Sequence, residues 1–92
     1  MARSVIVHPR VHDRHPDIDE DDVKVAWMGA IVSTLRLGKN PSEYVALGFD
    51  AKGRLLELVA VRTNNADWVV FHAMTPPSEE TFRELGIERR SK

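Results

Sequence analysis

Hydrophobic and polar residues alternate along three consecutive segments in the second half of the chain, and this alternation predicts three β-strands. The segments are EYVALGF (residues 43–49), RLLELVAVR (54–62) and DWVVFHAM (67–74). Two short segments, 50–53 and 63–66, separate them, and both contain residues that readily adopt turn conformations. The pattern therefore predicts an antiparallel sheet of three consecutive strands joined by four-residue turns.

Side chains in a strand point alternately to two faces, so the alternation also assigns the faces of this sheet. The expected core face comprises Val45, Leu47, Phe49, Leu56, Leu58, Ala60, Val69, Phe71 and Ala73. The other face comprises Tyr44, Ala46, Gly48, Leu55, Glu57, Val59, Val61, Trp68, Val70, His72 and Met74. With four-residue turns, Ala46 is expected opposite Glu57, and Glu57 opposite His72. A carboxylate and an imidazole are thus expected to be cross-strand neighbours on an otherwise apolar face.

The acidic segment 17–22 is explained by the start of a helix. Asp19 is placed as the N-cap, and Asp22 follows three residues later as the acidic partner of a capping box. Ile18 and Val23 have the spacing of a hydrophobic staple, and acidic residues in a first turn suit the helix dipole. We therefore expect a helix from Glu20 to about Leu35, and we favour capping over cation binding for these carboxylates.

The predicted helix carries apolar residues on two sides. Its inner stripe is Val23, Trp27, Ala30, Ile31 and Thr34, and a second apolar line comprises Val25, Met28 and Val32. This is more apolar surface than a helix with one solvated face carries. Either the chain itself covers both sides, which is the commoner arrangement, or the second line contacts another chain.

Shorter elements are expected around this helix and at the end of the chain. Ser4–His8 fits a short strand, the histidine-rich segment 8–15 is expected to be a loop, and Gly38–Pro41 is expected to lead into the sheet. After the third strand, Ser78 or Thr75 is expected to cap a short helix.

The predicted order is a short strand, a helix, three strands and a short helix that runs through Leu85 and stops at Gly86. We expect one domain with an ordered core of about residues 4–86 and a polar tail at 87–92. The predicted fold class is α+β, with a single antiparallel sheet packed by an N-terminal helix and a short C-terminal helix.

Composition narrows the functional classes. The 92 residues include no cysteine, which excludes disulfides, thiolate chemistry and cysteine-based zinc sites. The formal net charge of −1 argues against strong phosphate-driven binding of nucleic acid, although a local basic site remains compatible with it. The first ten residues contain only a short apolar run, so we expect neither a signal peptide nor a membrane span, and a cytoplasmic protein.

Carboxylates, imidazoles and guanidinium groups together suit acid–base chemistry at a phosphate, and metal-independent cleavage of RNA is one reaction of this kind. This cleavage needs a base for the 2′-hydroxyl, an acid for the leaving oxygen and cations for the phosphate. The Glu57–His72 pair can supply the first two, and His15 is a second candidate for proton transfer. Arg14, or alternatively Arg10 or Arg54, can supply the phosphate contact. In the structural alternative, Glu57 and His72 only satisfy one another, and the residues before the helix only pack at its entry.

Other patterns carry less weight. The spacing of His8, His12 and His15 permits metal ligation, but a loop beside a proline lacks the helical register that gives such spacings meaning, and we expect no metal and no cofactor. Trp68 and Tyr44 can stack on a base, although aromatic residues in this position more often pack under a loop or a partner.

Several short motifs resemble BrnT-type toxins, which belong to the RelE-like toxin superfamily of type II toxin–antitoxin systems. They are Arg14-His15 before the helix, Ile18 with the acidic cap 19–23, the segment GRLLELV at 53–59, and VFHAM at 70–74. The resemblance covers most of residues 8–86. It implies a RelE-like fold and a ribonuclease that arrests growth until a partner antitoxin neutralises it.

Two functional hypotheses follow. In the first, the chain is a toxin and a small metal-independent ribonuclease, with Arg14, His15, Glu57 and His72 as catalytic residues, RNA as substrate and an antitoxin protein as partner. In the second, the chain is a non-catalytic protein-interaction module of the same fold. The near-neutral charge and the absence of a basic residue directly after Ala73 favour the second hypothesis. A homodimer is compatible with either, and no membrane partner is expected.

Overall fold

The structure, a computed structural model, describes residues 4–36 and 42–87, and these form five strands and three helices. The chain order is β1 (Val5–Val7), α1 (Pro9–Arg14), α2 (Glu20–Met28), β2 (Val32–Arg36), β3 (Glu43–Phe49), β4 (Leu55–Arg62), β5 (Trp68–Met74) and α3 (Glu79–Glu84). The α+β class predicted from the sequence is confirmed. The strand predicted at Ser4–His8 and the three strands of the second half are confirmed as well. The segment expected at Gly38–Pro41 lies outside the described residues.

The strands form one mixed sheet in the order β1-β5-β4-β3-β2. β2 to β5 pair antiparallel in succession, whereas β1 runs parallel to β5. The expectation of a purely antiparallel sheet was therefore wrong. The expectation was based on strands joined by short turns, which run antiparallel. No turn joins β1 to β5, so their relative direction is not determined by a short connection.

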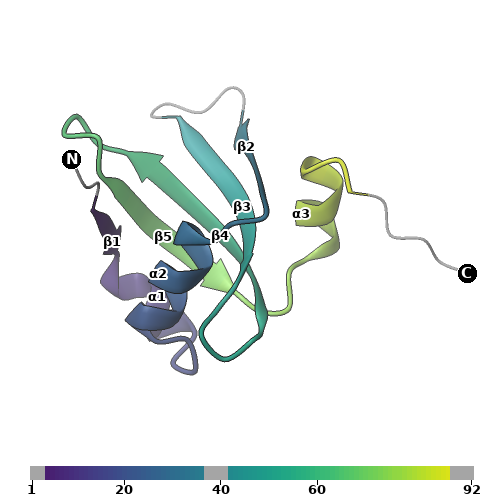
Figure 1. The fold of residues 1–92 in the computed structure, drawn as a ribbon, viewed down its shortest axis with the longest axis horizontal. Coiled ribbons are helices and arrows are strands. Elements are labelled where there is room, and N and C mark those ends of the chain that lie inside the picture. The colour runs from purple at the N-terminus through teal and green to yellow at the C-terminus, as the bar shows by residue number, and fades with distance from the viewer. Residues whose placement is uncertain (1–3, 37–41, 88–92) are drawn as a thin grey trace, which may run out of the picture.

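Helices cover both faces of the sheet (Figure 1). The face toward α1 and α2, here called the inner face, carries the main core. Its buried residues are Val11, Ile18, Val23, Ala26, Leu56, Leu58, Ala60, Val70 and Ala73. The opposite face, here called the outer face, lies toward α3, and the register aligns Leu47, Glu57 and Met74 across it. Burial on both faces explains why the strands read as almost continuously apolar.

Helix α2 ends seven residues before the predicted end at Leu35. Gly29 is its C-cap, and the N–H of Ile31 already donates to Leu47 O (2.8 Å) in the sheet. The prediction of one helix was wrong because Ile31, Val32 and Thr34 continue the two stripes of the predicted helix. All three are β-branched, so they also suit a strand. The second apolar line is therefore divided: Val25 and Met28 are exposed on α2, and Val32 begins β2.

The start of α2 matches its predicted capping. The N–H of Asp19 donates to Asp22 Oδ2 (3.0 Å), and Ile18 and Val23 are both buried in the core. Asp22 is 1% exposed, and it also accepts from Lys52 and from Arg54 Nη2 (3.2 Å). Burial opposes the ionisation of Asp22, but its hydrogen bonds, chiefly with Lys52, lower its pKa overall. The acidic segment thus serves the helix start and an ion network with the β3–β4 turn.

A glycine allows α2 to lie directly against the sheet. A Cβ added to Gly48 on β3 would lie 2.0 Å from the carbonyl oxygen of Ala26 in α2. This close backbone approach explains how Ala26 comes to be completely buried. The contact fixes the position of α2 on the inner face.

Both turns of the sheet are one residue longer than predicted. In the first, Asp50 N donates to Arg54 O (2.9 Å), and in the second, Thr63 N donates to Asp67 O (2.9 Å). Ala46 consequently lies opposite Leu58, and it is Leu47 that lies opposite Glu57. The predicted faces of β3 were therefore wrong relative to β4, because a shift of one residue exchanges the two faces of a strand.

The segment after β1 forms helix α1 where a loop was expected. Pro9 occupies its first turn, where the missing N–H costs nothing, and the Nδ1 atom of His8 accepts from Arg10 N (3.1 Å) as an N-cap. Val11 anchors α1 in the core, and His12 Nδ1 lies 3.1 Å from Ile18 O. The histidines of this segment thus lie on or beside a short helix.

Helix α3 begins after Ser78, one of the two N-caps that the sequence allowed, and the Ser78 hydroxyl oxygen accepts from Thr81 N (3.3 Å). At its other end, Glu84 forms two hydrogen bonds with Arg36 of β2 (2.6 and 3.1 Å), and Arg36 also contacts Glu43 of β3 (3.1 Å). Polar contacts therefore hold both ends of α3 on the outer face.

Candidate active site

Glu57 and His72 are in direct contact on the outer face. His72 Nε2 lies 2.7 Å from Glu57 Oε2, which confirms the predicted contact between these side chains. They are not opposite one another, because Glu57 pairs with Met74 and His72 pairs with Val59. The contact is a diagonal one on the same face, within the reach of long side chains.

A β-bulge in β5 sets the direction of His72. The register shifts between Ala60, which pairs with Val70, and Val59, which pairs with His72, so that Phe71 is an extra residue. Val70 is buried on the inner face, while His72 contacts Glu57 on the outer face. Bulges of this kind commonly redirect a side chain beside a functional site.

The carboxylate of Glu57 also receives the start of α3. Its Oε1 atom accepts from Ser78 N (2.8 Å), Ser78 Oγ (3.0 Å) and Thr81 Oγ1 (2.7 Å). Burial opposes the ionisation of Glu57, but hydrogen bonds from His72, Ser78 and Thr81 outweigh it and lower its pKa from 4.5 to about 2. Glu57 therefore stays ionised at neutral pH and is a poor proton acceptor. Its geometry suits the role of a fixed anion that orients His72.

His72 keeps one nitrogen available. An ionised carboxylate only accepts hydrogen bonds, so Nε2 of His72 carries the hydrogen that points to Glu57. In the neutral imidazole the Nδ1 atom then bears a lone pair, and within the described residues it has no hydrogen-bond partner. The side chain is 29% exposed. A partly exposed imidazole nitrogen, backed by a buried carboxylate, is the arrangement of a general base.

Arginines of α1 lie beside this part of β5. The guanidinium of Arg10 stacks over the ring of Phe71 at 5.9 Å, and Phe71 directly precedes His72. Arg14 is exposed and lies one helical turn after Arg10, on the same side of α1. His15 is the half-buried C-cap of α1. Neither Arg14 nor His15 forms a hydrogen bond or ion pair with Glu57 or His72. The structure therefore brings together only two of the four predicted site residues, and Arg14 and His15 belong to α1, which lies toward the inner face.

Other candidates from the sequence are engaged elsewhere. Arg54 bonds to Asp50 (2.8 Å), Asp17 and Asp22, which leaves it poorly placed to bind a phosphate. Trp68 is enclosed by Trp27, Tyr44 and the guanidinium of Arg62, so its ring is not free to stack on a base. No cluster of three His, Asp or Glu side chains suited to a metal ion occurs in residues 4–36 and 42–87.

The sequence did not identify Ser78 and Thr81 as partners of Glu57, nor Phe71 as a neighbour of the site. Ser78 was expected only as a helix cap, and its position over Glu57 depends on the path of the chain after β5. No sequence signal marked Phe71, because regular alternation placed Val70 and His72 on the same face, and only the bulge puts Val70 in the core.

Comparisons with family models, curated proteins and solved structures gave no match to this chain. None of the helices in the described part of the chain is long and apolar enough to cross a membrane.

Proposed function

We propose that the protein is the toxin component of a type II toxin–antitoxin system, with a RelE-like fold, and acts as a small metal-independent ribonuclease in the cytoplasm. The observation that carries the proposal is the contact of His72 Nε2 with the buried carboxylate of Glu57 (2.7 Å). The motif resemblance of residues 8–86 supplies the reaction class and the partner, and the geometry of the pair supplies a chemical role for each residue.

In this mechanism His72 Nδ1 accepts the proton of a ribose 2′-hydroxyl. The 2′-oxygen then attacks the adjacent phosphorus, the bond to the 5′-oxygen breaks, and a 2′,3′-cyclic phosphate forms. Glu57 stabilises the imidazolium through the hydrogen bond to Nε2, as a carboxylate does for a catalytic histidine in other hydrolytic sites. Arg14 contacts the phosphate, and His15 is the candidate that protonates the leaving 5′-oxygen.

The test is induced expression in a bacterial host, with growth and the integrity of total RNA followed over time. We expect growth arrest and RNA decay with the wild-type chain and neither with His72→Asn. The matched control is His8→Asn, which replaces a histidine outside the site and keeps an N-cap that can accept from Arg10 N. Purified protein is expected to yield 2′,3′-cyclic phosphate ends in the presence of EDTA. Intact RNA in the presence of soluble, folded wild-type protein would overturn the proposal.

A second candidate function, protein interaction without catalysis, is favoured by the outer side of α2. Val25 and Met28 are 46% and 73% exposed there, which is unusual for apolar side chains on adjacent turns of a helix. This surface is a candidate site for an antitoxin or for a second copy of the chain. Analytical ultracentrifugation of the chain alone, and with the product of an adjacent small open reading frame, distinguishes a second copy of the chain from an antitoxin as the partner. Complex formation that Met28→Glu abolishes, without any ribonuclease activity, would favour this function over the first.

A further inference from the structure

The two edges of the sheet differ in length. β1 forms one edge with three residues, and β2 forms the other with five. An edge strand presents a row of unpaired backbone N–H and C=O groups, and proteins commonly shorten, bend or charge such strands to prevent further pairing. The β1 edge is protected by its shortness, whereas β2 is long enough to pair with another strand.

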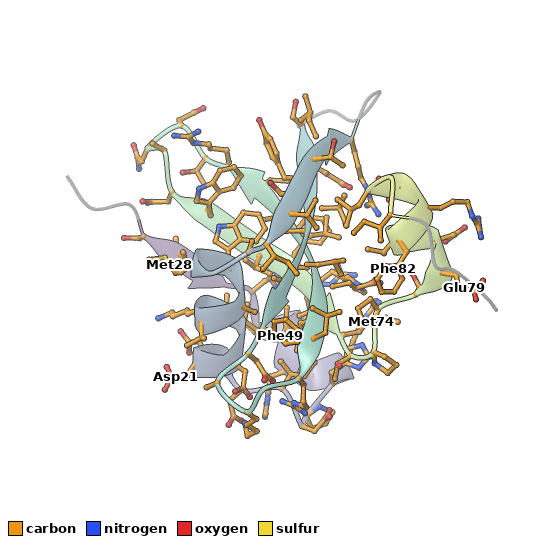
Figure 2. The ribbon with its side chains drawn as sticks, turned by 45° about the vertical axis from the view of Figure 1, so that its right-hand side comes forward. Asp21, Met28, Phe49, Met74, Glu79 and Phe82 are labelled. Carbon is orange, nitrogen blue, oxygen red and sulfur yellow. The ribbon has the colours of Figure 1, made fainter. Side chains whose placement is uncertain are left out.

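The β2 strand also lacks the other features that block an edge. It contains neither proline nor lysine, and its pairing with β3 runs over all five residues without a register shift. Its one charged residue, Arg36, forms ion pairs within its own chain, to Glu84 (2.6 Å) and Glu43 (3.1 Å). Figure 2 shows β2 at the front of the molecule, with α2 to one side and α3 to the other. Neither shape nor charge therefore opposes the approach of a further strand.

Exposed apolar side chains accompany this open edge. Ser33 lies opposite Ala46, which is buried on the inner face, so Ser33 and Leu35 point to that face. Leu35 is 41% exposed there, and Ile31, directly before β2, is 63% exposed. Helix α2 thus leaves the β2 margin of the inner face open to solvent. A strand added at this edge would bury apolar side chains in addition to pairing backbone groups.

A second copy of β2 fits this edge. Antiparallel pairing about a twofold axis perpendicular to the sheet can place Thr34 opposite its own copy and Leu35 opposite the partner's Ser33. A large exposed side chain then meets a small one in both halves of the interface. Arg36 lies opposite the partner's Val32, so the two arginines are four residues or about 13 Å apart along the strands. This exceeds the Debye length of about 10 Å at 0.1 M salt, so their repulsion is largely screened.

We propose that β2 is a dimerisation strand, through which two copies of the chain pair antiparallel around Thr34 and form one continuous sheet. This inference concerns the assembly of the chain and does not depend on cleavage of RNA. An interface made of one pair of short strands and a few side chains is small for a protein dimer. We therefore expect a reversible dimer with a dissociation constant of about 1–100 μM.

The experiment is sedimentation equilibrium of the full chain between about 1 and 500 μM, a range that spans the expected dissociation constant. The variant Ser33→Lys/Leu35→Lys places like charges opposite one another in both halves of the interface and should weaken dimerisation at least about 10-fold. The variant Ser33→Lys/Leu35→Glu places opposite charges at the same positions and should dimerise within about 3-fold of the wild type. Both positions are exposed, so circular dichroism should show an unchanged fold.

The matched control is Ser4→Lys/Ile6→Lys, which adds the same charges at the same spacing to the other edge of the sheet. Both residues are exposed, and this variant should dimerise like the wild type.

A cross-link tests the register directly. The chain contains no cysteine, so Thr34→Cys introduces a single thiol. Directly opposed residues of an antiparallel pair have Cβ atoms about 5 Å apart, which brings the two thiols within reach of a disulfide. We expect oxidation to link Thr34→Cys into covalent dimers under conditions that leave Ser4→Cys monomeric.

Three results would overturn the inference. The first is a monomeric wild-type chain over the whole range, including a chain whose β2 edge instead accepts a strand of another protein. The second is equal dimerisation of the wild type and Ser33→Lys/Leu35→Lys. The third is a dimer that Met28→Glu abolishes and the β2 charges leave intact, which would place the second copy on α2. A dimer that depends on β2 but cleaves no RNA would support this inference and overturn the proposed function.

Discussion

Val70 and His72 are only two residues apart in β5, yet their side chains lie on opposite faces of the sheet. Val70 is fully buried on the inner face, and His72 bonds to Glu57 on the outer face. Residues at this spacing share a face in a regular strand. The insertion of Phe71 as a bulge residue separates them, and it therefore allows the core and the candidate site to occupy neighbouring positions of one strand.

Deletion of Phe71 should leave the fold intact. Without it, Val70, His72 and Ala73 alternate regularly between the faces and retain their present partners on β4. We expect a loss of about 1–2 kcal/mol in the free energy of unfolding, from the lost burial of the ring. Urea denaturation and the NMR signals of the His72 imidazole check this outcome. The prediction is contradicted if the variant loses the contact between His72 and Glu57. In that case the geometry of the bulge, and not the alternation of side chains between the two faces, positions the imidazole.

Glu57→Gln should destabilise the protein at neutral pH. The pKa of Glu57 is about 2 in the folded protein and 4.5 when unperturbed, a difference that corresponds to on the order of 3 kcal/mol. Because the folded pKa is the lower one, this contribution is fully present above pH 4.5 and is lost as the pH falls toward 2. The difference in unfolding free energy between the wild type and Glu57→Gln should therefore shrink over that range.

Urea titrations at pH 7, 4 and 3 measure this difference. Glu79→Gln is the matched control, because Glu79 is an exposed glutamate in the first turn of α3 (Figure 2). Its effect should stay within about 0.5 kcal/mol at every pH. A constant difference between the wild type and Glu57→Gln across the range would contradict the assigned role of the carboxylate.

Asp22→Asn should cost about 2 kcal/mol in the free energy of unfolding. The carboxylate is buried, caps α2 through the N–H of Asp19, and receives Lys52 and Arg54 from the β3–β4 turn. The neighbouring variant Asp21→Asn removes an exposed charge from the same helical turn and should have little effect. Equal stabilities of the two variants would show that the ion network does not stabilise the fold.

Gly48→Ala should destabilise the protein by at least about 3 kcal/mol or prevent folding, because the new methyl group would meet the carbonyl of Ala26 at 2.0 Å. The comparison is Gly29→Ala at the end of α2, where a Cβ lies 3.4 Å from Val25 O. That change should cost less than about 1 kcal/mol. Thermal unfolding followed by circular dichroism distinguishes the two variants.

Local patterns predicted the strands β3 to β5, the capping of α2 by Asp19 and the N-cap Ser78, because each depends on residues close in sequence. The β2 strand was taken for helix, because the apolar spacing of residues 31–34 satisfies either structure until the pairing with β3 decides. The Asp22–Lys52 contact spans 30 positions and leaves no local signal.

The register errors explain why the contact between Glu57 and His72 was nevertheless predicted. Between β3 and β4, the longer turn shifts the pairing by one residue, and this single shift exchanged the faces assigned to β3. Between β4 and β5, the longer turn and the bulge each shift the pairing by one residue. Two shifts restore the face, so Glu57 and His72 remained neighbours although neither shift was predicted.

The sharing of one carboxylate between α3 and His72 makes the helix and the imidazole thermodynamically linked. When α3 lies on the sheet, Ser78 and Thr81 bond to Oε1 of Glu57, while His72 contacts Oε2 of the same group. Because the two oxygens belong to one rigid, planar carboxylate, a displacement of α3 also frees the atom that holds the imidazole. A partner that lifts α3 from the sheet would therefore loosen His72, and a ligand that fixes His72 against Glu57 would favour the docked helix by the same free energy.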